Sequence, residues 1–220
     1  MINQFPISQP NIQGVGPNNN NKNKIEEIIS SDNVKELQDL IQEKENNITS
    51  FKTVITSFRE IEEMKMPLIQ FCVLKNAIEC FKYLLVNGYD DPKKTMKEQN
   101  PNPEMGWSLN NNGTMEMKEI RRYEWDCMAT AIYYGNKEIV KILEEKEFEK
   151  GKNPSHIEAA ILSFRNTMVD EILEKIEEEK DVIKNILSFA LLTSAKNNNI
   201  RVTELLISKG TNINSNDIIY

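Results

Sequence analysis

The sequence predicts an all-α protein built from short antiparallel helical hairpins that stack side by side. Apolar residues recur at i, i+3 and i+4 over much of the chain, which is the period of an amphipathic helix. Glycine and asparagine interrupt this period at several places, where a helix would end and the chain turn back. One such hairpin is too small to bury its own apolar face, so we expect the 220 residues to stack several of them.

The N-terminal part divides into two segments. Residues 1–23 are rich in Asn, Pro and Gln and carry few large apolar side chains, so we expect a disordered tail. Residues 24–65 predict N-terminal helices, which can also be interpreted as a degenerate repeat. Val34, Leu37 and Leu40 form one apolar face, and residues 49–64 continue with a second helical period.

The first clear hairpin spans residues 66–91. Pro67 suits the first turn of a helix, where its missing N–H costs nothing. The apolar faces break at Lys75-Asn76 and end at Asn87-Gly88. Residues 92–119 follow, and Asn, Pro, Gly and Met dominate there without any period, which predicts an inserted loop that is either functional or disordered.

Three further hairpins are predicted within residues 120–217. The central one combines a helix at 127–134 with a helix at 137–146, separated by Gly135-Asn136. Gly adopts a left-handed backbone without steric cost, so it commonly ends a helix. The remaining two hairpins occupy 153–179 and 185–217.

The hairpins recur at a nearly constant spacing. The last Leu of each second helix is Leu84, Leu143, Leu173 and Leu206, and the intervals are 59, 30 and 33 residues. If one repeat is about 33 residues long, the first interval holds a repeat plus an excess that matches the 92–119 loop in place and size. A helix–turn–helix unit with a period near 33 is typical of ankyrin repeats.

Several short motifs strengthen this resemblance. Met66-Pro67-Leu68 resembles the Thr-Pro-Leu helix start of ankyrin repeats, and residues 131–136 resemble their Ala-Ala-x-x-Gly turn. LLVNGYD at 84–90 and LLISKGTNIN at 205–214 are similar to their closing LLxxGADxN. The chain resembles most the divergent, Asn-rich ankyrin proteins of protists. This resemblance implies an ankyrin-like helical solenoid of about four repeats with an N-terminal helical extension.

The resemblance also implies a function and a site. Ankyrin repeats bind partner proteins through a concave groove lined by the first helix of each repeat, so we expect a non-catalytic protein–protein interaction module. Tyr133 and Tyr134 occupy groove positions of the central hairpin, although one of the rings could instead pack on a neighbouring repeat. The predicted partner-binding residues are Tyr133, Tyr134, Thr130, Lys75, Lys196, Asn197 and Trp107.

Composition argues against other classes of function. A net charge of −7 is unfavourable for binding nucleic acid or an anionic membrane. His156 is the one histidine, so the sequence offers almost no general base that could activate a Ser or Cys nucleophile. We therefore expect no enzyme and no cofactor. Cys72, Cys80 and Cys127 show no metal-ligand spacing and predict buried free thiols in a reducing compartment. We therefore expect a cytoplasmic protein, and these features do not exclude a nuclear one.

A second function remains open from the sequence. The chain stops at Ile218-Ile219-Tyr220 without a polar capping helix, although terminal repeats normally need one. An apolar C-terminal edge could stack on another copy, which would make the protein a structural or assembly module that associates with itself.

Overall fold

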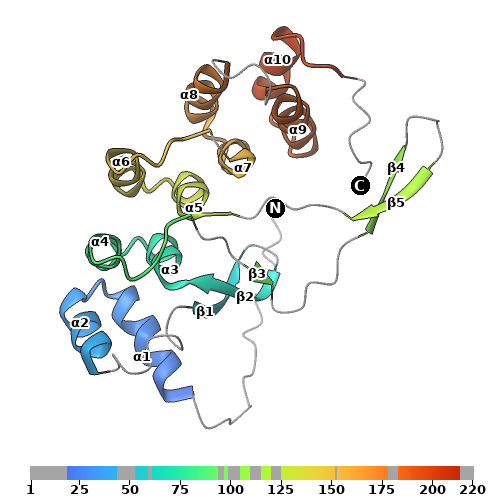
Figure 1. Cartoon of the computed structure of the whole chain (residues 1–220). Coiled ribbons are helices and arrows are strands. Elements are labelled where there is room, and N and C mark those ends of the chain that lie inside the picture. The colour runs from blue at the N-terminus through green and yellow to red at the C-terminus, as the bar shows by residue number, and fades with distance from the viewer. Residues whose placement is uncertain are drawn as a thin grey trace, which may run out of the picture.

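The computed structural model describes most of the chain, and its described part is mostly helical, as the sequence predicts (Figure 1). The described residues are 19–43, 53–58, 61–93, 97–98, 105–109, 115–119, 125–151, 153–177 and 183–213.

The helices of this part form five consecutive antiparallel pairs. In chain order the pairs are α1 (Asn19–Ser30) with α2 (Val34–Glu43), α3 (Leu68–Lys75) with α4 (Ile78–Val86), α5 (Cys127–Tyr134) with α6 (Lys137–Glu145), α7 (Pro154–Leu162) with α8 (Asn166–Glu177), and α9 (Ile183–Lys196) with α10 (Ile200–Ser208). Because α1 begins at Asn19, the prediction of a disordered tail is wrong for residues 19–23, while residues 1–18 lie outside the described part.

The five pairs stack into two curved layers (Figure 1). The first helices α1, α3, α5, α7 and α9 contact one another in that order and form the inner layer. The second helices form the outer layer, where α2 contacts α4 and α8 contacts α10. The predicted N-terminal extension is thus a further helical pair of the same stack, since α1 packs on α3.

Every pair uses the same turn between its two helices. One residue with positive φ ends the first helix, and we call it the turn residue; the five turn residues are Asp32, Asn76, Gly135, Phe164 and Asn198. The N–H after each turn residue donates to the carbonyl five residues earlier, as from Asn136 to Ala131 at 2.9 Å. This left-handed closure satisfies carbonyl groups at the helix end that would otherwise lack a partner.

The turn residues align the five helical pairs with one another more directly than the leucines used in the sequence analysis. Their spacings are 44, 59, 29 and 34 residues, from 32 to 76, 135, 164 and 198. In three pairs the second helix also closes at a positive-φ residue twelve positions after the turn residue, namely Gly88, Glu147 and Gly210. Ile172, rather than Leu173, is equivalent to Leu84, Leu143 and Leu206, so the third register mark of the sequence prediction is wrong by one residue.

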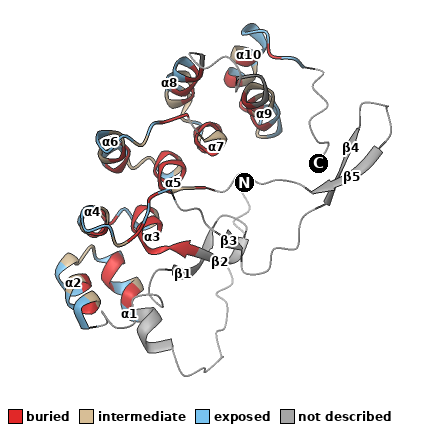
Figure 2. Cartoon of the chain, in the orientation of Figure 1, coloured by how far each residue is buried: buried red, intermediate tan, exposed pale blue. Residues whose placement is uncertain are grey.

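The core runs along the whole stack between the layers (Figure 2). The residue four positions before the turn residue is small and fully buried in four inner helices: Cys72, Ala131, Ala160 and Ser194. Small side chains at this position let neighbouring inner helices approach closely, so α3, α5 and α7 are buried over most of their surface.

The helical interpretation of residues 49–64 is wrong. The strands β1 (Thr53–Phe58) and β2 (Ile61–Pro67) pair antiparallel there, and β3 (Lys97–Glu98) adds to β2 in a sheet of order β1-β2-β3. The run Thr53-Val54-Ile55-Thr56 is rich in β-branched residues, which favour strands. Cross-strand pairing therefore prevails over the apparent helical period.

The described parts of the 92–119 segment include strands, which the prediction of a plain loop did not contain. They contain β3 and an antiparallel hairpin of β4 (Met105–Leu109) and β5 (Met115–Glu119), in which Trp107 pairs with Met117.

None of the helices described combines the length and the apolar character that crossing a lipid bilayer would require.

Candidate functional site

The inner face of the central helix α5 is closed rather than open. All residues from Cys127 to Ile132 are buried, and Thr130 is 0% exposed. The Thr130 hydroxyl accepts a hydrogen bond from Gln70 Nε2 at 2.8 Å and donates to the Asp126 carbonyl at 2.9 Å. The prediction of Thr130 as a partner contact is therefore wrong, because its hydroxyl links α5 to α3 inside the stack.

Gln70 is the polar link on the α3 side. Its side-chain amide also donates to the carbonyls of Trp125 at 2.9 Å and Asp126 at 3.1 Å, just before α5 begins. A buried amide of this kind fixes the position of the neighbouring helix start, since breaking the contacts would leave polar groups unpaired.

Three aromatic rings form a ladder beside α5. Trp125 and Tyr133 meet edge to face with centroids 5.2 Å apart, and Tyr133 and Tyr134 do the same at 5.1 Å. Trp125 Nε1 donates to a Glu158 carboxylate oxygen on α7 at 2.8 Å. Tyr133 is half-buried and packs within the stack, whereas Tyr134 is 41% exposed and accessible to a partner.

The exposed Tyr134 and the exposed Phe164 belong to neighbouring turns of the stack. Tyr134 directly precedes the turn residue Gly135, and a Cβ at Gly135 would overlap the guanidinium of Arg165. Because Arg165 directly follows Phe164, the α5–α6 and α7–α8 turns are neighbours along one edge of the stack. We call this edge, formed by the five turns, the turn edge.

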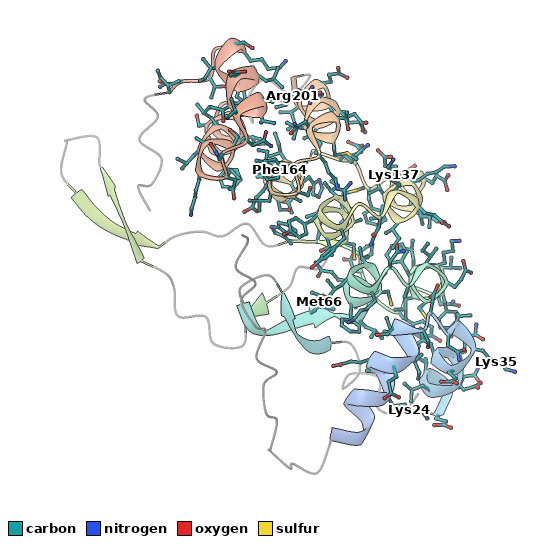
Figure 3. All side chains as sticks on the ribbon, turned by 180° about the vertical axis from the view of Figure 1, so that it is seen from behind. Lys24, Lys35, Met66, Lys137, Phe164 and Arg201 are labelled. Carbon is teal, nitrogen blue, oxygen red and sulfur yellow. The ribbon has the colours of Figure 1, made fainter. Side chains whose placement is uncertain are left out.

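Phe164 is the most unusual residue of the turn edge (Figure 3). Phe164 is 58% exposed, and its backbone has φ of 55°. The other turn residues are Gly, Asn or Asp, which tolerate this conformation best. A bulky side chain there carries backbone strain and also exposes apolar surface, so folding alone does not favour Phe at this position.

The other predicted site residues fall on or near the same edge. Lys75, Tyr134 and Asn197 each stand one position before a turn residue, and Lys196 stands two before. Lys75 and Lys196 are exposed, and Lys75 Nζ lies 5.3 Å from the centre of the Phe71 ring. Asn197 is half-buried and donates to the Thr193 carbonyl at 2.8 Å. Trp107 belongs to β4, and its side chain lies outside the described part.

Sequence reasoning missed Phe164 because the break was assigned to Arg165-Asn166. The available signal was a large aromatic residue inside a polar helix break, between Ser163 and Arg165.

His156 has a structural role. The ring is buried, its Nδ1 accepts from the Gly151 N–H at 3.1 Å, and its Nε2 contacts the Asp126 carboxylate at 3.0 Å. This geometry places the proton of the neutral ring on Nε2, which donates to Asp126. The same carboxylate accepts from the Ala129 N–H and caps α5, so the histidine joins α7 to the start of α5.

The three thiols are buried and free, as predicted. Burial is the main cause that raises the pKa of each thiol well above its ordinary range. For Cys80 the pKa reaches about 12, where burial is reinforced by a hydrogen bond to Asp32. A thiol that stays protonated is a weak nucleophile and a weak metal ligand.

Among the described residues, no cluster of three His, Cys, Asp or Glu side chains could hold a metal ion. The comparison with protein-family models found no match, and neither did the comparison with curated proteins.

Proposed function

We propose that this chain is an ankyrin-like repeat protein that binds another protein through its turn edge, without catalysis. The resemblance in sequence motifs supports the repeat family. The recurrence of one turn geometry in five helical pairs supports a repeated unit. The proposal moves the binding surface from the inner groove to the turn edge, because Thr130 is buried and Tyr133 packs on Trp125.

Equivalent contacts between successive pairs also support repeats. Asn136 Nδ2 donates to the Val73 carbonyl at 2.6 Å, and Asn199 Nδ2 donates to the Ile161 carbonyl at 3.4 Å. Each asparagine directly follows a turn residue, and each carbonyl belongs to the third residue before the preceding turn residue. A stack of this kind forms an extended surface, since each unit contacts only its neighbours.

The exposed, strained Phe164 is the observation on which the binding surface rests. Together with Tyr134 on the neighbouring turn it offers two rings to a partner. Exposed aromatic side chains are typical anchors of protein interfaces, because they bury much area at modest entropic cost. Lys75 and Lys196 on the same edge would then contact an acidic rim of the partner.

The test is to replace both rings and to measure binding and stability separately. We expect Phe164→Asn with Tyr134→Ser to weaken capture of the partner from native cell extract at least about tenfold, or roughly 1.4 kcal/mol. Asn occupies the equivalent position in two other turns, at Asn76 and Asn198. Phe164→Asn alone should therefore leave the free energy of unfolding unchanged or raise it by up to about 1 kcal/mol.

A matched control is Lys141→Ser with Glu145→Ser, an exposed pair 3.8 Å apart on the outer side of α6. Glu144 is unsuitable as a control because it pairs with Lys150 and Lys175. If the α6 variant loses the partner while the aromatic variant keeps it, the partner binds the outer layer and the turn edge is not the site.

A further inference from the structure

The face of α9 and α10 that points away from α7 and α8 is open and apolar. The third residue before the turn residue is fully buried in the four preceding pairs, at Ile29, Val73, Ile132 and Ile161. Its equivalent in α9, Ala195, is exposed. The apolar side chains that share this exposure are Leu192, Ile200 and Ile207. The last described pair thus presents surface that a following pair covers elsewhere in the stack.

Two contacts recur where one pair meets the next. The first is the hydrogen bond from the asparagine after a turn residue to the preceding pair, made by Asn136 to the Val73 carbonyl and by Asn199 to the Ile161 carbonyl. At the open face the equivalent acceptor is the carbonyl of Ala195.

The second recurring contact is an ion pair between neighbouring outer helices. Lys82 Nζ lies 3.1 Å from Glu138 Oε1, and Arg201 lies 2.9 Å from Asp170 Oδ2. In both cases the sixth residue after one turn residue meets the third residue after the next, and the charges are reversed between the two contacts. At the open face the sixth residue is Glu204, which is exposed.

A helical pair can therefore make both contacts with the open face if Asn directly follows its turn residue and a cation stands three positions after that turn residue. Among the described pairs, only α1–α2 and α9–α10 carry both, as Asn33 with Lys35 and as Asn199 with Arg201. Asn199 and Arg201 are already bonded to the preceding pair. Lys35 is exposed and lies at the opposite end of the stack from Arg201 (Figure 3).

We propose that two copies of this chain associate head to tail, with α1–α2 of one copy stacked on the open face of α9–α10 of another. Lys35 of one copy then pairs with Glu204 of the other, and Asn33 donates to the Ala195 carbonyl. The contact joins two different surfaces, so it extends into chains of copies and does not close into a symmetric dimer. It uses neither Phe164 nor Tyr134, so it does not depend on the partner proposed for the turn edge.

This contact is weaker than an interior one. Lys24 and Glu27 of α1 are exposed, whereas the equivalent residues of α5, Cys127 and Thr130, are fully buried. The joint between copies therefore buries less apolar surface and depends more on charge. We expect association that rises with protein concentration and weakens as salt screens the ion pair.

Charge reversal provides the decisive experiment. The mass of the 220-residue chain is measured by sedimentation at several concentrations in low salt, where the wild type should grow beyond a dimer. Lys35→Glu and Glu204→Lys should each weaken association about tenfold, and the double variant should restore it. Lys141→Glu on the exposed side of α6 is the matched control and should behave as the wild type.

A monomer at every concentration would overturn the proposal. So would association that neither single reversal weakens, or a double variant that stays as weak as the single ones. Phe164→Asn should leave self-association intact, which separates failure of this proposal from failure of the turn edge as a binding surface.

Discussion

Phe164 illustrates how far a single position can be predicted. The residue types that favour a left-handed backbone were visible at Asp32, Asn76, Gly135 and Asn198, so the sequence breaks fall at or beside these turn residues. At Phe164 the propensity rule fails, since a bulky residue adopts the left-handed backbone there. Departures of this kind are expected at functional sites, and this expectation supports a binding role for Phe164 in the turn edge.

A prediction at this scale concerns the Asn136 side chain. Asn136→Ala should lower the free energy of unfolding by about 1 kcal/mol, because it removes the hydrogen bond to the Val73 carbonyl. Ala77 already occupies the equivalent position of the α3–α4 pair with a similar backbone, so the substitution adds no strain. Urea unfolding measures the change.

The comparison variant is Asn197→Ala, whose side chain donates within its own helix turn, to the Thr193 carbonyl. It should cost less than Asn136→Ala. Equal losses would show that the bond between pairs contributes nothing beyond a local one.

At the scale of elements, the helices could be predicted and the strands could not. α5 spans Cys127–Tyr134, as its apolar period and Gly135 predict, because these signals lie within a dozen residues. β1 and β2 depend on each other, and their residues at 54, 55, 58 and 61 also fit a helical period. Pairing across a hairpin is information that the period of one segment does not contain.

Packing between inner helices gives the second prediction. Ala131 is fully buried where α5 approaches its neighbours, and the equivalent positions hold Cys72, Ala160 and Ser194. Ala131→Leu should overpack this contact and cost about 1–3 kcal/mol. Thermal unfolding compared with Ala131→Ser, which imitates Ser194, measures the effect. Equal melting temperatures for the two variants would contradict close helix packing at this position.

The third prediction concerns the link between α6 and α8. Lys150 is buried, and its Nζ lies 3.1 Å from Glu144 and 2.7 Å from Glu171. Burial alone would lower the pKa of Lys150, but the hydrogen bonds to Glu171 and Glu144 outweigh it and raise the pKa above its usual value. The lysine is therefore charged at neutral pH and holds two carboxylates together.

We expect Lys150→Met to lower the free energy of unfolding by about 2 kcal/mol at pH 7, since two charge-assisted hydrogen bonds are lost. A raised pKa stabilises the fold below the unfolded value of about 10.4, and this contribution disappears as pH rises through the higher folded value. The difference between wild type and variant should thus stay constant from pH 7 to about 9.5. A difference that vanishes by pH 8 would contradict a charged, bonded Lys150.

At the scale of the whole molecule, the stack could be predicted but its accessible surfaces could not. The first pair, α1 with α2, was expected only as a helical extension or a degenerate repeat, because it lacks the glycine and proline signals that mark the other pairs. The resemblance to ankyrin repeats implied a groove lined by the first helices, yet Gln70 from the neighbouring pair covers the Thr130 hydroxyl. Exposure depends on what packs across pairs, and residues far apart in sequence decide it.

The last prediction follows from the three thiols, which lie together in the core of the α1–α6 half of the stack. Each has a folded pKa raised mainly by burial, whereas the unfolded value is about 8.5. Above pH 8.5 the unfolded chain loses protons that the folded chain keeps, so stability falls as pH rises. Each thiol should contribute about 1.4 kcal/mol per pH unit once the unfolded thiol is ionised.

Urea unfolding under reducing conditions between pH 7.5 and 10 measures this slope. Cys80→Ala should reduce the slope by about a third, because Cys80 keeps its proton to a pKa of about 12 in the folded chain. The absolute stability of the variant also changes through packing, so the comparison concerns the slopes alone. Stability that stays flat to pH 10 would mean that the thiols ionise in the folded chain and that the core around Cys72, Cys80 and Cys127 admits water.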